Sequence, residues 1–181
     1  MRVTTGLARG RKLVAPQGLD TRPSSDMTKQ AVFNIVQNYV EGSTFLDLFA
    51  GSGQMGIEAL SRGAKHAVFV DASPKAIQAV RENLAHCGFA DKAKVAQMDA
   101  QSFLKSTTTR FDLAFLDPPY QQQIIDAVLP AVVQQMAPGG IILCETERNE
   151  QLPEQAGDYA LTKTYFYGKA KITAYRRQEE A

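Results

Sequence analysis

The chain has 181 residues, of which 44% are hydrophobic and 22% are charged, and its formal net charge is +1. This length suffices for one well-cored domain and is short for two ordinary ones. No apolar run approaches the roughly 20 residues needed to span a bilayer, and residues 1–5 lack the apolar core of a secretory signal. We therefore expect one soluble, cytoplasmic domain, residues 1–181, and exclude the membrane-spanning and secreted classes.

Residues 2–15 are short, partly apolar and interrupted by Gly6 and Gly10 before Pro16. Turn residues between short apolar runs are typical of a hairpin. The sequence therefore predicts a small, basic N-terminal β-hairpin.

An amphipathic helix is predicted next. After an extended segment before Pro23, apolar residues recur at intervals of four from Met27 to Tyr39, and Gly42 follows. We treat residues 1–42, hairpin and helix together, as an extension of a catalytic core formed by residues 43–181.

From residue 44 onward, short apolar runs alternate with helical segments. Strands are expected at 44–49, 66–70, 93–98, 111–116 and 140–145, and helices near 54–62, 74–87, 100–105 and 121–136. Such alternation predicts a Rossmann-like α/β fold, with a mostly parallel sheet that is covered on both faces. The rhythm changes after residue 145, where two runs, 159–167 and 171–176, predict a C-terminal antiparallel hairpin.

A glycine-rich turn follows the first core strand, where residues 45–53 read FLDLFAGSG. Gly51 and Gly53 permit backbone angles closed to other residues and let a ligand approach the main chain. With Gly56 and an acid at Asp71, twenty residues after Gly51, the spacing also satisfies the dinucleotide fingerprint. At this point a nicotinamide dinucleotide and an adenosyl cofactor are equally supported.

A second motif, Asp117-Pro118-Pro119-Tyr120, ends the fourth apolar run and separates the two interpretations. A hydride-transfer enzyme has no evident use for it. In combination with the acid before LFAGSG and the acid that ends the next strand, it resembles the S-adenosylmethionine-dependent methyltransferases that act on amines.

The predicted cofactor site lies at one rim, because ligands of open α/β sheets bind outside the carboxyl ends of the strands. Asp71 is expected to accept the ribose hydroxyl groups and Asp99 the adenine amino group, with helix capping as the alternative for each. Asp47 stands inside an apolar strand and must be paired or hydrogen-bonded. The residues assigned to the cofactor at this rim are Asp47, Phe49, Ala50, Gly51, Ser52, Gly53, Asp71, Ala72, Ser73, Asp99 and Ala100.

The predicted catalytic residues are Asp117, Pro118, Pro119 and Tyr120. The Asp117 carboxylate and the Pro118 carbonyl can accept hydrogen bonds from an exocyclic amine as positive charge develops on it. The prolines stiffen the turn, and Tyr120 offers a flat face for an extruded base. Because no group of metal ligands accompanies the two histidines, we expect no metal and no sensitivity to chelators.

The charge is unevenly distributed along the chain. Residues 1–29 and 160–177 are basic, and the stretch between them is acidic. If the fold brings both ends to one rim, they would form a surface suited to a phosphate backbone, although lysines also protect edge strands. Arg9, Arg11 and Lys12 are the predicted RNA-binding residues.

A closer resemblance is carried by GRKL at 10–13, TRPSSD at 21–26, AVFNI at 31–35, LDLFAGSG at 46–53, GIEALSRGA at 56–64 and DPPY at 117–120. Together these segments are similar to the RsmD-like family, which methylates a guanine N2 in 16S rRNA. The resemblance implies a bacterial cytoplasmic enzyme that uses S-adenosylmethionine on the small ribosomal subunit or an assembly intermediate.

The resemblance also implies that Arg22 and Pro23 close over the cofactor. Where the family usually has arginine after the aspartate of that segment, this chain has Met27. Any charge contact made there by the family is therefore in doubt.

Three alternatives stay open. A DNA adenine-N6 methyltransferase would use the same Asp-Pro-Pro-Tyr motif, but 181 residues leave no separate target-recognition domain. An NAD-dependent oxidoreductase would explain the glycine turn alone. A non-catalytic ribosome assembly factor would bind the cofactor without turnover. Nothing in the sequence demands a dimer, so we expect a monomer.

Overall fold

The computed structural model describes residues 1–18, 26–119 and 121–179. Its helices are α1 (Asp26–Ile35), α2 (Gln54–Ser61), α3 (Pro74–Cys87), the 3-10 turn η1 (Ala90–Lys92), α4 (Ala100–Ser106) and α5 (Gln121–Gln134). Its strands are β1 (Thr44–Asp47), β2 (His66–Asp71), β3 (Ala93–Gln97), β4 (Phe111–Leu116), β5 (Met136–Glu147), β6 (Gln155–Ala156), β7 (Tyr159–Tyr167) and β8 (Ala170–Arg177). Within this part of the chain, no helix has the length and apolar character required to cross a bilayer.

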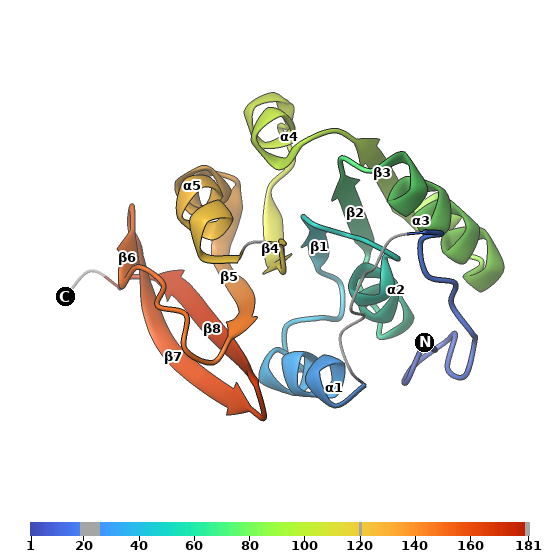
Figure 1. Ribbon diagram of the computed structural model, residues 1–181, viewed down its shortest axis with the longest axis horizontal. Coiled ribbons are helices and arrows are strands. Elements are labelled where there is room, and N and C mark those ends of the chain that lie inside the picture. Colours follow the sequence, from blue (N-terminus) through green and yellow to red (C-terminus); the bar gives the residue numbers. More distant parts are fainter. Residues whose placement is uncertain (19–25, 120, 180–181) are drawn as a thin grey trace.

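The strands form one eight-stranded sheet in the order β3-β2-β1-β4-β5-β8-β7-β6 (Figure 1). The pairs among β3, β2, β1, β4 and β5 are parallel, whereas β8, β7 and β6 join in antiparallel pairs. The expected fold class, a mostly parallel sheet with a C-terminal antiparallel hairpin, is confirmed.

Helices cover both faces of the parallel part of the sheet, as the continuous apolar runs predict. Phe45 of β1 packs with residues of α1, α2 and α3, whereas its neighbour Leu46 packs with residues of α4 and α5. Two apolar cores, one on each face, fix the strand register because a slip by one residue would exchange the two sets of side chains.

The strand order places a topological switch point between β1 and β4. From β1 the chain winds outward to β2 and β3, and it then crosses to β4 on the other side of β1. The loops that leave β1 and β4 therefore diverge, which opens a crevice at their carboxyl ends. The glycine turn and the Asp117 turn flank this crevice.

The N-terminal hairpin was predicted as two strands, and this prediction is wrong in detail. The two arms are joined by a single antiparallel bridge, between Arg2 and Lys12. Backbone hydrogen bonds also cross between the arms, for example from the Val3 N–H to the Arg11 carbonyl. Nearer the turn the donors bond to α2 instead, including the Thr4 N–H to Glu58 and the Leu7 N–H to the Ser61 carbonyl, so the pairing of the arms extends no further.

Other elements also differ from expectation. Helix α1 ends at Ile35, and a turn continues the apolar pattern, in which Val36 and Val40 remain buried. Strand β5 begins at Met136 rather than 140, because a register shift opposite Phe111 accommodates Pro138 and Gly139 in the pairing. The two-residue strand β6 carries no sequence signal and was not predicted.

Candidate active site

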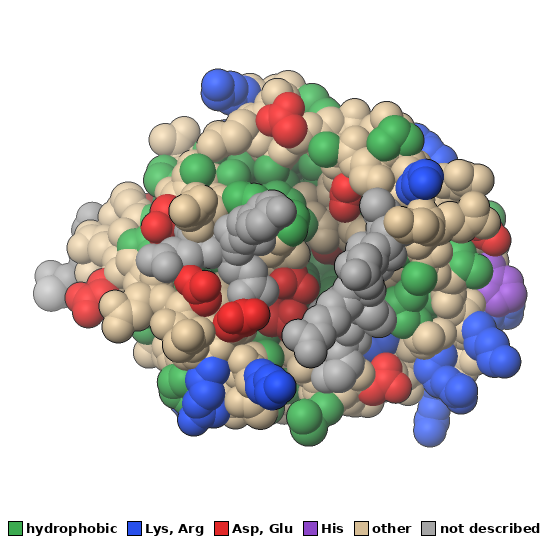
Figure 2. Space-filling model, in the orientation of Figure 1, with side chains coloured by type: hydrophobic (Ala, Val, Ile, Leu, Met, Phe, Trp, Pro, Cys, Tyr) green, Lys and Arg blue, Asp and Glu red, His purple; other side chains and the backbone are tan. Residues whose placement is uncertain are grey.

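A cavity of about 630 Å³ opens at the carboxyl ends of β1, β2 and β4. Figure 2 shows acidic side chains gathered around this hollow at the centre of the view. Of the predicted site residues, it is lined by Asp47, Phe49, Ala50, Gly51, Ser52, Asp71, Ala72, Ser73, Asp99, Ala100, Asp117, Pro118 and Pro119. The fold thus brings the cofactor and catalytic candidates together in one site.

The glycine turn has the left-handed backbone angles that its sequence predicts. Gly51 has a φ of 55°, and a Cβ atom added there would meet nothing within 4 Å, so the main chain is open to the cavity. Gly53 is different. It does not line the cavity; it precedes α2 with a φ of 81°, and a Cβ there would lie 3.2 Å from Val80 and 3.3 Å from the Phe69 ring. The left-handed φ and the close packing therefore both favour glycine at position 53, and its cofactor contact stays a prediction.

Asp47 is the most perturbed acid of the cavity wall. It is 2% exposed, and its Oδ2 accepts a hydrogen bond of 3.0 Å from the Gly56 N–H. Burial raises the pKa of Asp47 to about 8, the Gly56 hydrogen bond opposes this shift, and the nearby charges of Asp71 and Asp117 add to it. The expectation that this acid is hydrogen-bonded is confirmed.

Asp71 ends β2 and connects two loops of the cavity. Its Oδ2 accepts from the Gly51 N–H and its Oδ1 accepts from the Ser73 N–H, both at 2.9 Å. The N-cap of α3 is Ser73, whose hydroxyl accepts from Ala76, so Asp71 is not the capping residue. Since each carboxylate oxygen has a second lone pair, Asp71 retains acceptor capacity toward the cavity. Its ribose contact stays a prediction.

Asp99 caps α4, as its alternative interpretation proposed. Its Oδ2 accepts from the Ser102 hydroxyl at 2.7 Å and its Oδ1 from the Ser102 N–H at 2.9 Å. These two hydrogen bonds hold the pKa of Asp99 below its usual range. The carboxylate is exposed and lines the cavity, so a further contact to a ligand amino group remains compatible with the cap.

Asp117 and Pro118 follow the carboxyl end of β4 on the opposite side of the switch point from β2. Asp117 is half-buried, Pro118 is buried and Pro119 is exposed, and all three line the cavity. Tyr120, the fourth residue of the motif, lies outside the described residues, as do Arg22 and Pro23. Their predicted roles stay predictions.

Several lining residues were missed by the sequence interpretation. Gln54 and Met55 directly follow the glycine turn, Met98 precedes Asp99, and Phe115 lies near the end of β4, two residues before Asp117. Their positions beside the motifs could have identified them. The remaining missed residues are Met1, Pro16, Leu48, Ala76 and Ile124. Met1 and Pro16 have no local signal, because the segment that carries them reaches the cavity only through contacts far along the chain.

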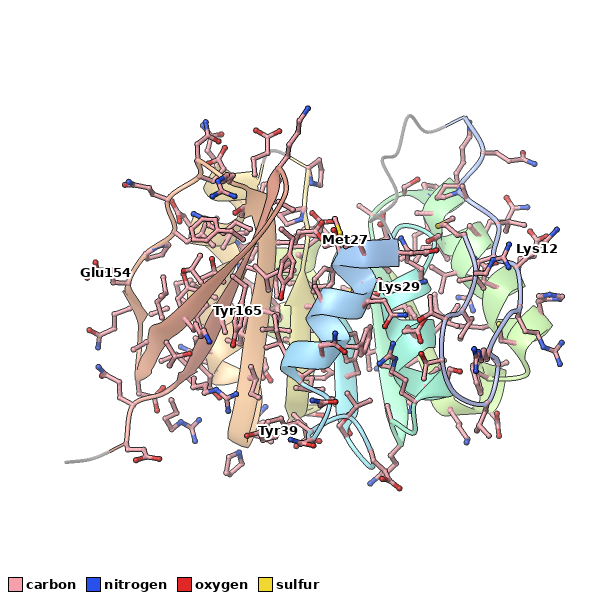
Figure 3. The ribbon with its side chains drawn as sticks, turned by 90° about the horizontal axis from the view of Figure 1, so that it is seen from below. Lys12, Met27, Lys29, Tyr39, Glu154 and Tyr165 are labelled. Carbon is pink, nitrogen blue, oxygen red and sulfur yellow. The ribbon has the colours of Figure 1, made fainter. Side chains whose placement is uncertain are left out.

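A buried ionic cluster fastens that segment to the core. The side chain of Lys29 is fully buried, and its Nζ donates to the Arg2 carbonyl at 2.7 Å and to Gln54 Oε1 at 3.5 Å. The same Nζ lies 3.6 Å from Oε1 of Glu58, whose side chain is also fully buried. Figure 3 shows Lys29 on the side of α1 that faces the N-terminal segment. This cation therefore links α1, α2 and the start of the chain.

Glu58 is the centre of the cluster. Its oxygens accept from the Thr4 N–H at 2.9 Å, the Thr5 N–H at 3.2 Å and the Arg62 Nε at 3.0 Å. These contacts explain why a single bridge is enough to hold the hairpin arms: side chains of α2 supply the acceptors that a second strand would otherwise offer. The cluster thereby holds the start of the chain, with Met1, at the cavity, whereas the segment before Pro16 is held by Asn83 of α3 through the backbone of Val14.

The predicted RNA-binding residues lie away from the cavity lining. Arg9, Arg11 and Lys12 are exposed, and the Arg11 guanidinium donates to the His86 carbonyl at 3.2 Å. Figure 3 places Lys12 on one side of α1 and Tyr165 of β7 on the other. The two basic ends of the chain therefore flank α1 rather than forming one continuous patch.

The residues of the cavity fit an adenosyl cofactor. A volume of about 630 Å³ lies within the roughly 300 to 1,000 Å³ that is usual for ligand sites. The open main chain at Gly51 and the carboxylate of Asp71 offer close approach and hydrogen-bond acceptors. In the described part of the chain, no group of three or more His, Cys, Asp or Glu side chains could hold a metal ion.

Comparisons with known proteins identify the relatives of this arrangement. The family described as conserved hypothetical protein 95 matches residues 1–176. Ribosomal RNA small subunit methyltransferase D of Escherichia coli K12 is 30% identical, over 99% of this chain and 91% of its own. The same-named protein of Haemophilus influenzae is 34% identical over 84% and 81%. The chain belongs to the RsmD family.

Other relatives agree with this membership. The YlbH protein of Bacillus subtilis (strain 168) is 41% identical to this RsmD-family chain over 98% of it and 100% of its own length. The solved Escherichia coli protein YhhF superposes with a TM-score of 0.87 at 29% identity, covering 99% of each chain. The fold is also that of an RNA methyltransferase from Salinibacter ruber solved with S-adenosyl-L-homocysteine, with a TM-score of 0.70 at 16% identity over 88% and 96%.

Proposed function

We propose that this RsmD-family protein transfers a methyl group to the exocyclic N2 of a guanine in 16S rRNA. The methyl donor is S-adenosylmethionine. One observation carries the proposal: Asp117, Pro118 and Pro119 open onto the same cavity as the glycine turn. Family membership supports the substrate class, because two relatives are named small subunit rRNA methyltransferases.

The cofactor supplies an activated methyl group on a sulfonium centre. The chain's contribution is to hold the donor and the acceptor nitrogen in line, which requires positioning rather than covalent chemistry. Gly51 and Asp71 hold the adenosyl part, and Asp99 receives the adenine amino group. Asp47 would face the cationic amino acid portion, whose positive charge would favour the ionised form of this carboxyl group.

On the acceptor side, the Asp117 carboxylate and the Pro118 carbonyl accept hydrogen bonds from the exocyclic amine. Acceptors in this position stabilise the nitrogen as it becomes tetrahedral and positively charged. The resulting ammonium is acidic enough to lose its proton to water, so Asp117 orients the amine and need not remove the proton itself. Tyr120 stacks on the extruded base.

The test is transfer of labelled methyl from S-adenosylmethionine to small ribosomal subunits isolated from a strain without this gene, followed by nucleoside analysis. The expected product is N2-methylguanosine. Asp117→Ala should lower the rate about 100-fold or more, as loss of a pre-organised transition-state contact does. The matched control is Asp126→Ala, which removes an exposed acid of α5 outside the cavity lining and should act at the wild-type rate.

Other products would redirect the proposal. Label in N6-methyladenine of DNA would establish the adenine methyltransferase alternative. Binding of S-adenosylhomocysteine without label in any nucleic acid would leave a non-catalytic assembly role. Binding of NAD instead would establish the oxidoreductase. Whether naked rRNA or an assembly intermediate is the better substrate follows from the same assay with each as acceptor, and sedimentation tests the expected monomer.

A further inference from the structure

The sheet has a face on which aromatic rings and cations alternate. Beyond α1, Figure 1 shows no helix over the lower side of β7 and β8 among the described residues. Two partly buried tyrosines of β7, Tyr165 and Tyr167, pack there against the core on the α1 side. We name this surface the α1–β7 face, and it consists of Met27, Tyr39, Lys163, Tyr165, Tyr167 and Arg176.

Two cations are placed over aromatic rings on this face. The Lys163 Nζ lies 4.8 Å from the Tyr165 ring centre, and the Arg176 guanidinium lies 5.1 Å from that of Tyr39. Tyr39 is 46% exposed, so its ring and the guanidinium above it form a flat, cationic platform at the surface. Such platforms stack bases, and neighbouring cations contact phosphates.

The charge of the two strands suits a polyanion. Residues 160–177 contain five basic residues and no acid. Arg177 pairs with Asp158, and Lys171 donates to the Glu150 carbonyl, so these two cations are directed elsewhere. Lys163 and Arg176 remain directed over the α1–β7 face, where they add positive charge beside exposed aromatic surface.

The strand register connects this face to the candidate active site. Tyr167 pairs with Ala170, which pairs with Glu147 at the carboxyl end of β5. That end lies at the same rim as Asp117, because β5 is parallel to β4. At the other end of the face, Arg176 pairs with Ala160. The length of β7 from Ala160 to Tyr167 is roughly 24 Å at about 3.4 Å per residue.

We propose that the α1–β7 face binds single-stranded RNA that is continuous with the target nucleotide. This inference rests on the proposed function and adds a second RNA contact, across α1 from Arg9, Arg11 and Lys12. The strand leaves the cavity mouth past Met27 and Tyr167, follows β7, and ends on the Arg176–Tyr39 platform. A face of this length suits the lower end of single-strand sites, about 4 to 16 nucleotides.

The test uses a fluorescein-labelled, single-stranded RNA of twelve nucleotides with one central guanosine, and measures anisotropy at several salt concentrations. Lys163→Gln combined with Arg176→Gln should weaken binding about tenfold at low salt and reduce the salt slope by roughly 1.4, since each single-strand contact contributes about 0.7. Tyr39→Leu should weaken binding roughly tenfold without changing the slope.

The matched control is Lys92→Gln combined with Lys94→Gln, which removes the same charge from the opposite edge of the sheet at η1 and β3. This control should bind RNA as the wild type does. All variants should bind S-adenosylhomocysteine equally by calorimetry, and in the methylation assay KM for RNA should rise while kcat stays unchanged.

Equal loss in both double variants, or no loss in either, would overturn the proposal. If the face variants still methylate rRNA and bind RNA with unchanged affinity, the RNA-binding role of the α1–β7 face is overturned while the proposed function stands. The face would then be a surface for a protein partner. A wild type that binds S-adenosylhomocysteine but neither binds nor methylates RNA would overturn the proposed function as well.

Discussion

Two buried carboxyl groups lie at helix α2, and their surroundings are opposite: Glu58 belongs to the helix, and Asp47 of β1 bonds to it. Glu58 has Lys29 within 3.6 Å and Arg62 within 3.0 Å, together with hydrogen bonds from the N-terminal segment. Asp47 has the Gly56 N–H, and none of the ion pairs among the described residues includes it. A carboxylate whose charge is compensated within the fold holds structure together. One whose charge is not compensated is poised for a cationic ligand.

The largest expected effect is at the compensated site. Glu58→Gln leaves the buried Lys29 ammonium with only the exposed Asp26, 4.0 Å away, as an anion. Breaking a buried pair in this way costs about 3–5 kcal/mol of unfolding free energy. Urea denaturation measures the loss. The control is Asp158→Asn, which breaks the surface pair with Arg177 and should cost about 0–1 kcal/mol. If both variants lose the same amount, the cluster does not fasten the N-terminal segment.

An intermediate effect is expected where the two sites meet, at Gly56. A Cβ atom there would lie 2.3 Å from the ring of Phe69, which is fully buried. Gly56→Ala should therefore lower the unfolding free energy by about 1–3 kcal/mol through overpacking. It should also displace the Gly56 N–H, which donates a hydrogen bond to Asp47.

A double-mutant cycle checks this explanation. Phe69→Leu alone should be destabilising because it leaves a cavity, but in the Gly56→Ala background it should cost much less, since it removes the clash. Strictly additive losses would show that the ring does not limit the size of residue 56.

The smallest loss of stability at neutral pH is expected at Asp47. Because burial raises the pKa of Asp47 to about 8, the folded protein holds this proton at pH 7 while the unfolded chain does not, which costs stability. Asp47→Asn removes that cost and keeps an acceptor for the Gly56 N–H, so it should not lower the unfolding free energy at pH 7. The folded pKa exceeds the unfolded one, so the folded state binds more protons between the two values. The contribution of Asp47 to the unfolding free energy is therefore fully present below the unfolded pKa, is lost as the pH rises toward 8, and does not change further above that.

Thermal melts between pH 6 and 9 measure this difference. The wild type should lose stability over this range because Asp47 ionises, and Asp47→Asn should lose less. The two curves of melting temperature against pH should therefore move apart as the pH rises. Asp126→Asn, an exposed acid, should follow the wild type. Parallel curves for wild type and Asp47→Asn would contradict the raised pKa.

Much of the parallel half of the fold could be predicted because its signals are local. Each strand is a short apolar run, each loop carries its own turn chemistry, and the rule that ligands bind at carboxyl ends brought Asp47, Asp71 and Asp117 to one rim. Most of the predicted cofactor residues line the cavity for the same reason.

The N-terminal wall could not be predicted, because the groups that hold it are far apart in sequence. Nothing in the local pattern around Lys29 shows that this cation is buried against Glu58. Helix periodicity indicates that Lys29 lies beside apolar residues, but it does not identify an ion-pair partner 29 positions later in the sequence. Likewise, the glycine spacing does not reveal that a Cβ atom at Gly53 would meet Val80 and the Phe69 ring, because a linear motif contains no information on packing. The cofactor contact assigned to Gly53 stays a prediction.

The distances that hide the N-terminal wall from sequence analysis also set the time at which it forms. Thr4 bonds to Glu58, 54 positions later, and the Val14 N–H donates to the side chain of Asn83, 69 positions later. Contacts of such separation form after the local ones, because loop closure must come first. A nascent chain that has not yet delivered α3 therefore carries this segment without its Asn83 acceptor, and the cavity is completed only after the β1-α2-β2-α3 unit has been made.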